Sequence, residues 1–231
     1  MKIFNSLILL IFIFSSTSTA QPALTFTTAD NQTHARSMAM NLVLTECFKR
    51  MGINLLIIPM PSKRSLLNAN NGMEDGNFLR TDNIGHIYPN LIKVPEKIAE
   101  NRVMVFSKNT NMVVDGWKSL FKYHVVYING WRNCERELKG INNKTVVKDE
   151  GLLFSLLEKD RADVGVFGYD TGIEVLTTKK YSHIKALEPP ITVSDLFLYV
   201  HKKHGRLIPD IVRNIKIMKM DGTYQAMINM F

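Results

Sequence analysis

The sequence predicts an exported α/β protein in which two β-α modules follow each other. Strand and helix patterns alternate over residues 24–70, and the same alternation restarts near residue 117. The first 20 residues have the layout of a secretory signal. The chain has 231 residues, of which 45% are hydrophobic and 22% charged, a globular composition with enough length for a large core in one or two domains.

Residues 1–20 contain a basic start, a short apolar stretch and a run of small residues. Lys2 precedes the apolar residues 3–14, and Ser and Thr residues then lead to Ala20. This order is typical of a signal peptide cleaved after Ala20, and the apolar stretch is short for a helix that spans a bilayer. We therefore expect a secreted, periplasmic product, with an uncleaved membrane anchor as the alternative.

Charge and cysteine content narrow the class of protein further. Lys and Arg outnumber Asp and Glu by 29 to 21, which gives a formal net charge of +8. This surplus favours anionic partners, but its scatter along the chain does not favour nucleic acid. Cys47 and Cys134 would meet an oxidising compartment after export. Because they lie far apart, each in a predicted helix, we expect two buried free thiols, with a disulfide as the alternative.

The first module has the order strand, helix, strand, helix. Residues 24–28 alternate between apolar and polar and predict a short strand. Apolar side chains then recur at helical spacing from Met40 to Met51, and Gly52 ends this helix. Residues 53–58 form a near-continuous apolar run, which predicts a strand buried on both faces. A second helix is predicted over residues 62–70, followed by a turn at Asp75-Gly76.

Residues 91–111 interrupt this rhythm before the second module begins. Residues 91–94 and 103–106 are predicted as two separate strands, and the polar patch at 107–111 as a crossing between domains. The second module is predicted to contain strands at 125–128, 145–147 and 164–167 and helices at 117–121, 131–138 and 171–178. A further helix, with apolar positions between Leu152 and Leu157, is predicted to be capped by Asp149.

The last part of the chain predicts one more strand and a long helix. Glu188-Pro189-Pro190 is expected to break the chain before a strand at 197–200. Apolar residues over 207–218 have helical spacing, and residues 220–224 are predicted to break and restart this helix at Gly222.

Motifs of the common enzyme classes do not occur in the sequence. It has no Gly-x-Ser-x-Gly, no His-Glu-x-x-His, no phosphate-binding glycine loop and no Cys-x-x-Cys. His201 and His204 lie among Lys202, Lys203 and Arg206, which favours a solvated basic turn over a metal site. Composition and periodicity therefore indicate an exported α/β protein, and no further function.

An ordered set of short segments resembles a known family. The segments are Asp75-Gly76-Asn77-Phe78-Leu79-Arg80, Tyr88 through Glu96, Phe106-Ser107-Lys108, Trp117-Lys118-Ser119-Leu120, Val126-Tyr127-Ile128-Asn129-Gly130-Trp131, Leu157 through Val164, and Met218 through Tyr224. Together they resemble the bacterial extracellular solute-binding proteins of family 3. Each segment alone is weak evidence for the resemblance, but the set covers nearly all of the chain after residue 20 in the family's order.

The resemblance implies a two-lobed α/β protein of the type II periplasmic-binding architecture, with mixed, mainly parallel sheets and a ligand cleft between the lobes. Lobe one would be residues 21–107 and 199–231, and lobe two residues 108–198, with crossings near Ser107 and Leu198. The implied protein is a monomer without cofactor or metal that captures a small solute for a membrane permease. A sensor or interaction module is the alternative, and an enzyme on the same fold, with Glu46, Asp75 or Asp170 as its acid, is a further one.

The resemblance also implies where a ligand would bind. Arg80 lies where the family holds the solute's carboxylate, and Gly130, Trp131 and Arg132 occupy the place of a helix N-terminus that meets an anion. Trp131 would close the cleft with a flat apolar face, and Arg132 would pair with a carboxylate or phosphate. The family's aspartate for an amino group falls near Gly168, which cannot replace it. We therefore expect an anionic, ring-bearing solute rather than an α-amino acid.

Four further residues are weaker candidates for ligand binding. Asp30 follows the first predicted strand, where α/β folds place ligands, but it would equally cap the first helix. Arg64 belongs to the second predicted helix, and a solvated position is its alternative. Tyr88, Tyr169 and Trp131 could each pack in the core instead of binding a ligand, since aromatic side chains are usually buried.

Overall fold

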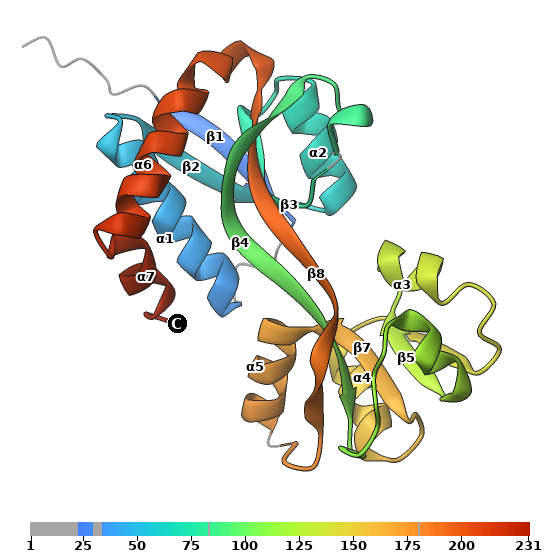
Figure 1. Cartoon of the computed structure of the whole chain (residues 1–231). Helices are drawn as coiled ribbons and strands as arrows, with labels where there is room; N and C mark the ends of the chain where they lie inside the picture. The colour runs from blue at the N-terminus through green and yellow to red at the C-terminus, as the bar shows by residue number, and fades with distance from the viewer. Residues whose placement is uncertain (1–22, 30–33, 83, 180) are drawn as a thin grey trace, which may run out of the picture.

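Two lobes joined by two long strands make up the molecule, as a computed structural model shows (Figure 1). The structure describes residues 23–29, 34–82, 84–179 and 181–231. The predicted signal peptide and the candidate Asp30 lie outside the described residues. The joining strands are β4 (Leu91–Ser107) and β8 (Lys185–His201), which pair antiparallel along their length. Among the described residues, no helix has the length and apolar character that a bilayer crossing needs.

The described strands form one eight-stranded mixed sheet in the order β2-β1-β3-β8-β4-β7-β5-β6. Strands β1, β2 and β3 run parallel to one another in the first lobe, and β5, β6 and β7 do so in the second. The antiparallel strands β4 and β8 lie between these two sets and continue the sheet from lobe to lobe. The remaining strands are β1 (Ala23–Thr28), β2 (Asn54–Pro59), β3 (Gly76–Arg80), β5 (Val125–Ile128), β6 (Lys144–Val147) and β7 (Val164–Gly168).

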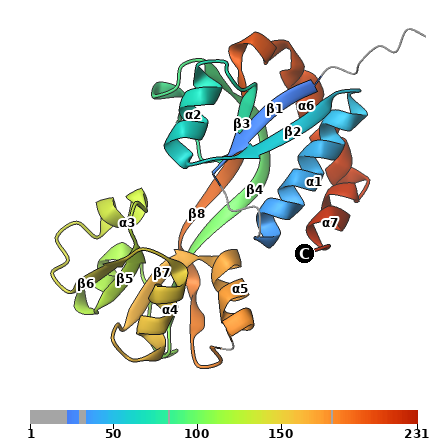
Figure 2. The same cartoon turned by 180° about the vertical axis from the view of Figure 1, so that it is seen from behind.

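Helices from both ends of the sequence cover the sheet of the first lobe. Figures 1 and 2 show α1 (Ala35–Arg50), α6 (Ile208–Met220) and α7 (Thr223–Ile228) on one face and α2 (Ser62–Asn70) on the other. Phe26 of β1 packs edge-on against Phe48 of α1, with ring centroids 5.1 Å apart. Ile211 and Ile215 of α6 complete the same core, so the predicted C-terminal helix is confirmed and joins residues near the start of the chain.

The second lobe is made from the middle of the chain. Its helices are η2 (Trp117–Lys122), α3 (Arg132–Glu137), α4 (Glu150–Glu158) and α5 (Tyr169–Lys179). The predicted cap of α4 is confirmed, because the Asp149 carboxylate accepts a hydrogen bond from the Leu152 N–H at 2.9 Å. Short helices η1 (Ile84–His86) and η3 (Lys202–Leu207) belong to the first lobe. The β-α rhythm read from the sequence is therefore present in both lobes.

Strand β4 corrects the expectation of two separate strands. Residues 91–107 form one strand because the charged stretch between 94 and 103 keeps its backbone pairing with β8, for example Arg102 with Val193. The strand passes from the first core, which contains Ile98, to the second, which contains Val103. Strand β8 changes core between residues 187 and 196. The division of the lobes at residues 107 and 198 stays a prediction.

Strand β8 also contains the proline pair that was expected to break the chain. The pairing with β4 moves from Thr192 opposite Val103 to Leu187 opposite Val105, so residues 188–191 form a bulge. This part of β8 pairs with β4 alone, since β3 pairs with β8 only near residues 197–200. Pro189 and Pro190 therefore lie where a missing N–H removes no second ladder bond, which is where strands tolerate proline.

Strand β2 is not buried on both faces, contrary to its apolar sequence. It is the end strand of the sheet, paired only with β1, and its Leu56 side chain is 58% exposed. An apolar run fixes the strand itself but not its place in the sheet, because the order of strands depends on pairings distant in sequence.

The basic turn near residue 204 is exposed at Lys202, Lys203 and Arg206, as predicted, but its two histidines are not fully solvated. His201 is buried, and the Asp75 carboxylate accepts from His204 Nε2 at 2.7 Å, Lys203 Nζ at 2.8 Å and the Thr25 N–H at 2.8 Å. Burial alone would raise the pKa of Asp75, but the hydrogen bonds from Lys203, Thr25 and His204 outweigh it and hold the pKa below its usual value. This carboxylate therefore stabilises the fold above its unfolded-state pKa of about 3.9, and the contribution is lost as pH falls through the lower folded-state pKa.

Both cysteines are buried free thiols, as predicted, and one lies in each lobe. Burial raises the pKa of Cys47 and of Cys134 to about 12. The thiolate, which is the reactive form, is then about a thousandfold scarcer than at an ordinary pKa near 9. We expect no thiol to react with Ellman's reagent in the folded protein at pH 8, and two per chain to react in guanidinium chloride without reductant. Fewer than two after unfolding would indicate a disulfide instead.

Candidate functional site

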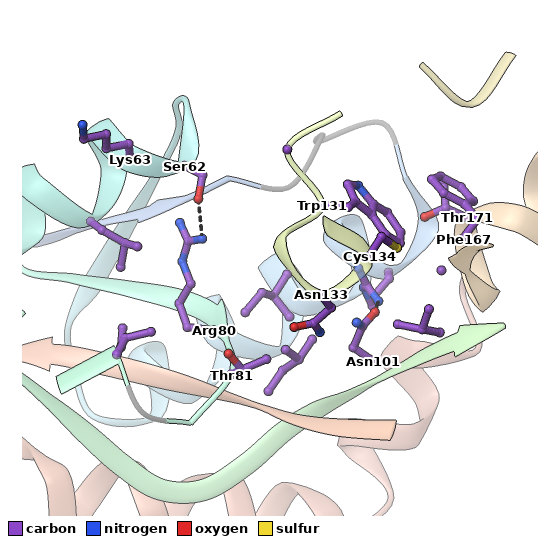
Figure 3. Close-up of a pocket in the computed structure, with 18 of the residues that line it drawn as sticks. Ser62, Lys63, Arg80, Thr81, Asn101, Trp131, Asn133, Cys134, Phe167 and Thr171 are labelled. Carbon is purple, nitrogen blue, oxygen red and sulfur yellow. Dashed lines mark hydrogen bonds between the residues drawn. The ribbon is translucent and has the colours of Figure 1, made fainter. Parts of the chain in front are cut away.

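A pocket of about 890 Å³ lies between the lobes and takes its walls from both (Figure 3). Its first-lobe wall comes from the start of α2, the end of β3 and the segment around η1. Its second-lobe wall comes from the start of α3 and the end of β7. The lining includes Ser62, Lys63, Arg80, Thr81, Ile87 and Tyr88 from the first lobe and Gly130, Trp131, Asn133, Phe167, Gly168 and Thr171 from the second.

A bulge in β3 directs Arg80 toward this pocket. Asn77 pairs with Tyr199 and Arg80 with Phe197, so β3 advances three residues while β8 advances two. Residues three apart on a regular strand point to opposite faces of the sheet. The extra residue cancels this alternation, and the side chains of Asn77 and Arg80 meet, with Arg80 Nε donating to Asn77 Oδ1 at 2.5 Å. The bulge therefore sets the direction of the candidate cation.

The guanidinium of Arg80 is fixed by neutral oxygen atoms. Nη1 donates to the Ser62 hydroxyl at 2.9 Å (Figure 3), and Nη2 donates to the Ser65 hydroxyl at 2.6 Å. Asn77, fully buried, donates in turn to the hydroxyls of Ser65 at 2.9 Å and Thr27 at 2.7 Å. This network holds a planar guanidinium in one orientation, an arrangement suited to a carboxylate or phosphate.

Leu79 carries the strain of the bulge, because its φ of +58° is in the left-handed region that side chains other than glycine rarely adopt. We expect Leu79→Gly to be more stable than Leu79→Ala by about 1 kcal/mol, since both lose the buried side chain and only glycine relaxes the backbone. Urea unfolding measures the difference. At Leu198, a buried leucine of β8 with ordinary backbone, the glycine variant should instead be less stable than the alanine variant. Equal order at both positions would contradict strain at Leu79.

Tyr199 supports the floor of the first-lobe wall. Its hydroxyl donates to the carbonyl of Thr81 at 3.1 Å, and Thr81 follows Arg80 in the pocket lining. Burial raises the pKa of Tyr199 to about 12, so the hydroxyl stays a donor at any physiological pH. Tyr88, a predicted ligand-binding residue, lines the pocket and also packs against the small core around Tyr199.

Trp131 forms an aromatic wall in the second lobe. Its indole stacks on Phe167, with ring centroids 5.0 Å apart and planes at 18°. The side chain is only partly buried although it packs against both cores of this lobe, so part of its surface faces the pocket. Trp131 is therefore both a core residue and a residue of the pocket wall, with a different part of its side chain in each environment.

The turn before α3 is arranged differently from an open anion site. Gly130 has φ of +82° and lines the pocket, but its N–H donates to the Glu135 carboxylate at 2.9 Å. The Glu135 carboxylate thus accepts the hydrogen bond from the Gly130 N–H, which was expected to donate to a ligand. Arg132 begins α3, and its side chain is outside the described part of the structure.

Two other predicted ligand-binding residues lie away from the pocket lining. Arg64 is exposed on α2, one residue beyond Lys63, which does line the pocket. Tyr169 begins α5 and lies under the guanidinium of Arg102, 4.0 Å from its ring centroid.

Polar contacts connect the lobes beside the pocket. Arg36, in the first turn of α1, donates to Asn101 Oδ1 of β4 at 3.2 Å and lies 3.6 Å from the Asp170 carboxylate of α5. Arg102 approaches the same carboxylate at 3.5 Å. Both Arg36 and Asn101 line the pocket, and the ion pair of Arg36 with Asp170 connects the lobes beside it.

Sequence reasoning missed several polar lining residues, and Ser62, Lys63, Arg36 and Asn101 are four of them. Three of them share a signal that was available, because they lie in the first turn of a helix that follows a parallel strand, the edge where α/β sheets bind ligands. Asn101 gives no such signal, since the charged stretch around it predicts a gap between two strands.

The three carboxylates considered for an enzyme do not line the pocket. Glu46 pairs with Arg50 at 3.0 Å on the surface of α1, Asp75 is covered by His204 and Lys203, and Asp170 faces Arg36 and Arg102. Each of the three therefore forms ion pairs with basic side chains of this chain instead of facing the pocket.

Comparison with known proteins identifies the fold. No family model matches the chain. An uncharacterized protein of Shewanella oneidensis is 22% identical over 191 residues, 80% of this chain and 72% of its own length. Two similar solved structures are the GluR0 ligand-binding core in complex with L-glutamate (TM-score 0.73, 8% identity, 90% of this chain, 96% of that one) and a histidine kinase sensor domain with similarity to periplasmic binding proteins (TM-score 0.70, 10% identity, 89% and 93%).

An amino-acid ABC transporter substrate-binding protein of Streptococcus pneumoniae, bound to L-arginine, is a third similar structure (TM-score 0.66, 12% identity, 90% of this chain and 93% of that one). At such identities the likeness shows the fold alone. The chain has the mixed α/β, two-lobed fold of the periplasmic binding proteins, as the sequence predicted.

Proposed function

We propose that this chain is a periplasmic binding protein, not an enzyme, and that it captures a small anionic solute in the cleft between its lobes. The observation that carries the proposal is Arg80, whose guanidinium is fixed in the wall of a pocket that both lobes line. A cavity of about 890 Å³ is within the range of small-molecule sites. The structural neighbours, which are solute-binding proteins and a sensor domain, support a binding role.

The charge of the lining supports an anionic solute. Lys63 and Arg80 contribute cationic side chains, Arg36 contributes a third that also faces the Asp170 carboxylate, and no described residue of the lining is an Asp or Glu. Ser62, Thr81, Asn101 and Asn133 add neutral hydrogen-bonding groups. A small anion would exchange its hydration for charge-assisted hydrogen bonds here.

A screen of organic acids and amino acids by thermal shift tests this proposal. A ligand at a hundred times its Kd adds about 2.7 kcal/mol to the free energy of unfolding, which raises Tm by about 5–10 °C in a chain of this size. We expect organic anions to give such shifts at low millimolar concentration. If no small anion stabilises the folded protein, the proposal is wrong.

Delivery to a membrane permease is the role we propose, and the similarity to a sensor domain makes ligand sensing the second candidate. Both roles use the same capture step, so binding data do not separate them. A strain that lacks the protein should lose uptake of the radiolabelled ligand that the screen identifies. Unchanged uptake together with loss of a ligand-dependent transcriptional response would assign the protein to sensing.

A further inference from the structure

We propose that the solute carries a flat aromatic ring beside its anionic group, with the ring stacked on Trp131 and the anion held at Arg80. This assignment rests on the proposed binding function and names the chemical class of the ligand. Both groups lie in the wall of one pocket but on different lobes (Figure 3). A ligand with an anionic end and an aromatic end would therefore contact both lobes at once.

The aromatic wall is rigid before any ligand arrives. Phe167 is almost fully buried and makes an edge-on contact with Phe154, with ring centroids 5.9 Å apart. Trp131 lies on this fixed ring and is held from below by the core of the second lobe. A platform with one settled orientation binds a second ring without the entropy cost of ordering a mobile side chain.

Gly168 leaves the space beside the indole open. A Cβ at this position would lie 3.7 Å from Trp131 Cη2 and 4.0 Å from Asn101 Oδ1, so its direction is into the pocket wall. Any larger side chain at residue 168 would occupy the volume next to the tryptophan. Its absence matches a planar group lying there, and the volume of about 890 Å³ accommodates a ring in addition to a carboxylate.

The cationic side chains of the pocket and its stacked aromatic pair come from different lobes. Arg80, Ser62 and Lys63 supply charge and hydrogen bonds from the first lobe. On the second lobe, Trp131 and Phe167 supply an apolar surface. A ringless anion would satisfy the first set and leave the second in contact with water, whereas an aromatic carboxylate matches both.

A matched pair of carboxylates tests this assignment. 3-Phenylpropionate and butyrate share the carboxylate and its aliphatic stem and differ by the ring, and isothermal titration calorimetry measures both. We expect 3-phenylpropionate to bind about tenfold more tightly, which is the amount that one stacked and buried ring contributes. In Trp131→Leu the ratio should fall to about two, with the affinity for butyrate unchanged.

Fluorescence gives a second readout that a purely structural role of Trp131 would not produce. The chain has two tryptophans, and Trp117 donates from Nε1 to the Thr192 hydroxyl away from the pocket lining. In Trp117→Phe, the emission of Trp131 alone should change saturably with 3-phenylpropionate at the calorimetric midpoint. Phe121→Leu, which alters an exposed aromatic residue of the same lobe, is the matched control and should keep the tenfold preference.

The outcomes separate the ring assignment from the binding function. Equal affinity for the two carboxylates, or an unchanged preference in Trp131→Leu, overturns the aromatic assignment and leaves anion binding in place. The same holds if the wider screen returns only ringless anions. If no anion binds at all, the proposed function itself is wrong.

Discussion

Alanine at Arg80 should weaken the binding of an organic anion by about a hundredfold or more, because it removes a fixed, partly buried charge and leaves the anion without its main partner. Calorimetry on the ligand found in the screen measures the loss. The affinity of Arg80→Lys should lie between those of the wild type and the alanine variant, since lysine keeps the charge but not the planar fork of donors. Arg80→Ala should also lower the free energy of unfolding by about 1–3 kcal/mol, because buried Asn77 and Ser65 lose a hydrogen-bond partner.

A distant arginine provides the control for this experiment. Arg213 on α6 is 64% exposed, pairs with Asp210 at 2.7 Å and is far from the pocket lining. Arg213→Ala lowers the net charge by the same amount and should leave affinity unchanged. If both alanine variants bind equally well, Arg80 is not the anion site. Circular dichroism at the assay temperature shows whether a silent variant is folded.

Alanine at Gly76 should cause the largest loss of stability, about 3 kcal/mol. An added Cβ would lie 2.5 Å from the backbone oxygen of Tyr199 and 2.8 Å from the ring of Phe26. Strand β3 is paired with β1 on one side and β8 on the other, so it cannot shift away from the contact. Urea unfolding, followed by tryptophan fluorescence and circular dichroism, measures the effect.

Gly151 in the first turn of α4 is the matched control for Gly76. Its added Cβ would meet only the Asp149 carboxylate, at an ordinary contact distance of 3.5 Å. Gly151→Ala should therefore raise the free energy of unfolding by about 0.5–1 kcal/mol, because alanine loses less backbone entropy in a helix. If Gly76→Ala leaves the free energy of unfolding unchanged or raises it as Gly151→Ala does, the close approach at Gly76 is absent.

The sequence predicted correctly those helices and strands that are determined by residues close together in the chain. Helix α1 and the cap of α4 were recognised from apolar spacing and from Asp149, and strand β5 was found at its observed bounds. Strands β4 and β8 were misjudged because their continuity depends on pairing between residues about a hundred positions apart. Periodicity carries no information on such pairings, so the charged residues in β4 and the proline pair in β8 predict breaks that the structure does not have.

The candidate site was predicted where a side chain's direction follows from its place at a strand end. Trp131 and Tyr88 line the pocket, and so does Arg80. The orientation of Arg80 comes from a one-residue bulge that no residue type in β3 announces, since Leu79 is an unusual choice for a positive φ. Lys63 and Arg64 show the same limit, because one residue along a helix turns a side chain by about 100°, from the cleft into water.

The first lobe's use of both chain ends fixes the order in which the molecule can be completed on the ribosome. Strands β5 to β7 and both long strands are made before residue 208, so the second lobe has all its parts early. The apolar side of α1 has to wait for Ile211, Ile215 and Met218, which are translated after every strand of the second lobe. A nascent chain therefore presents a finished second lobe and an unsealed first one until α6 has been made.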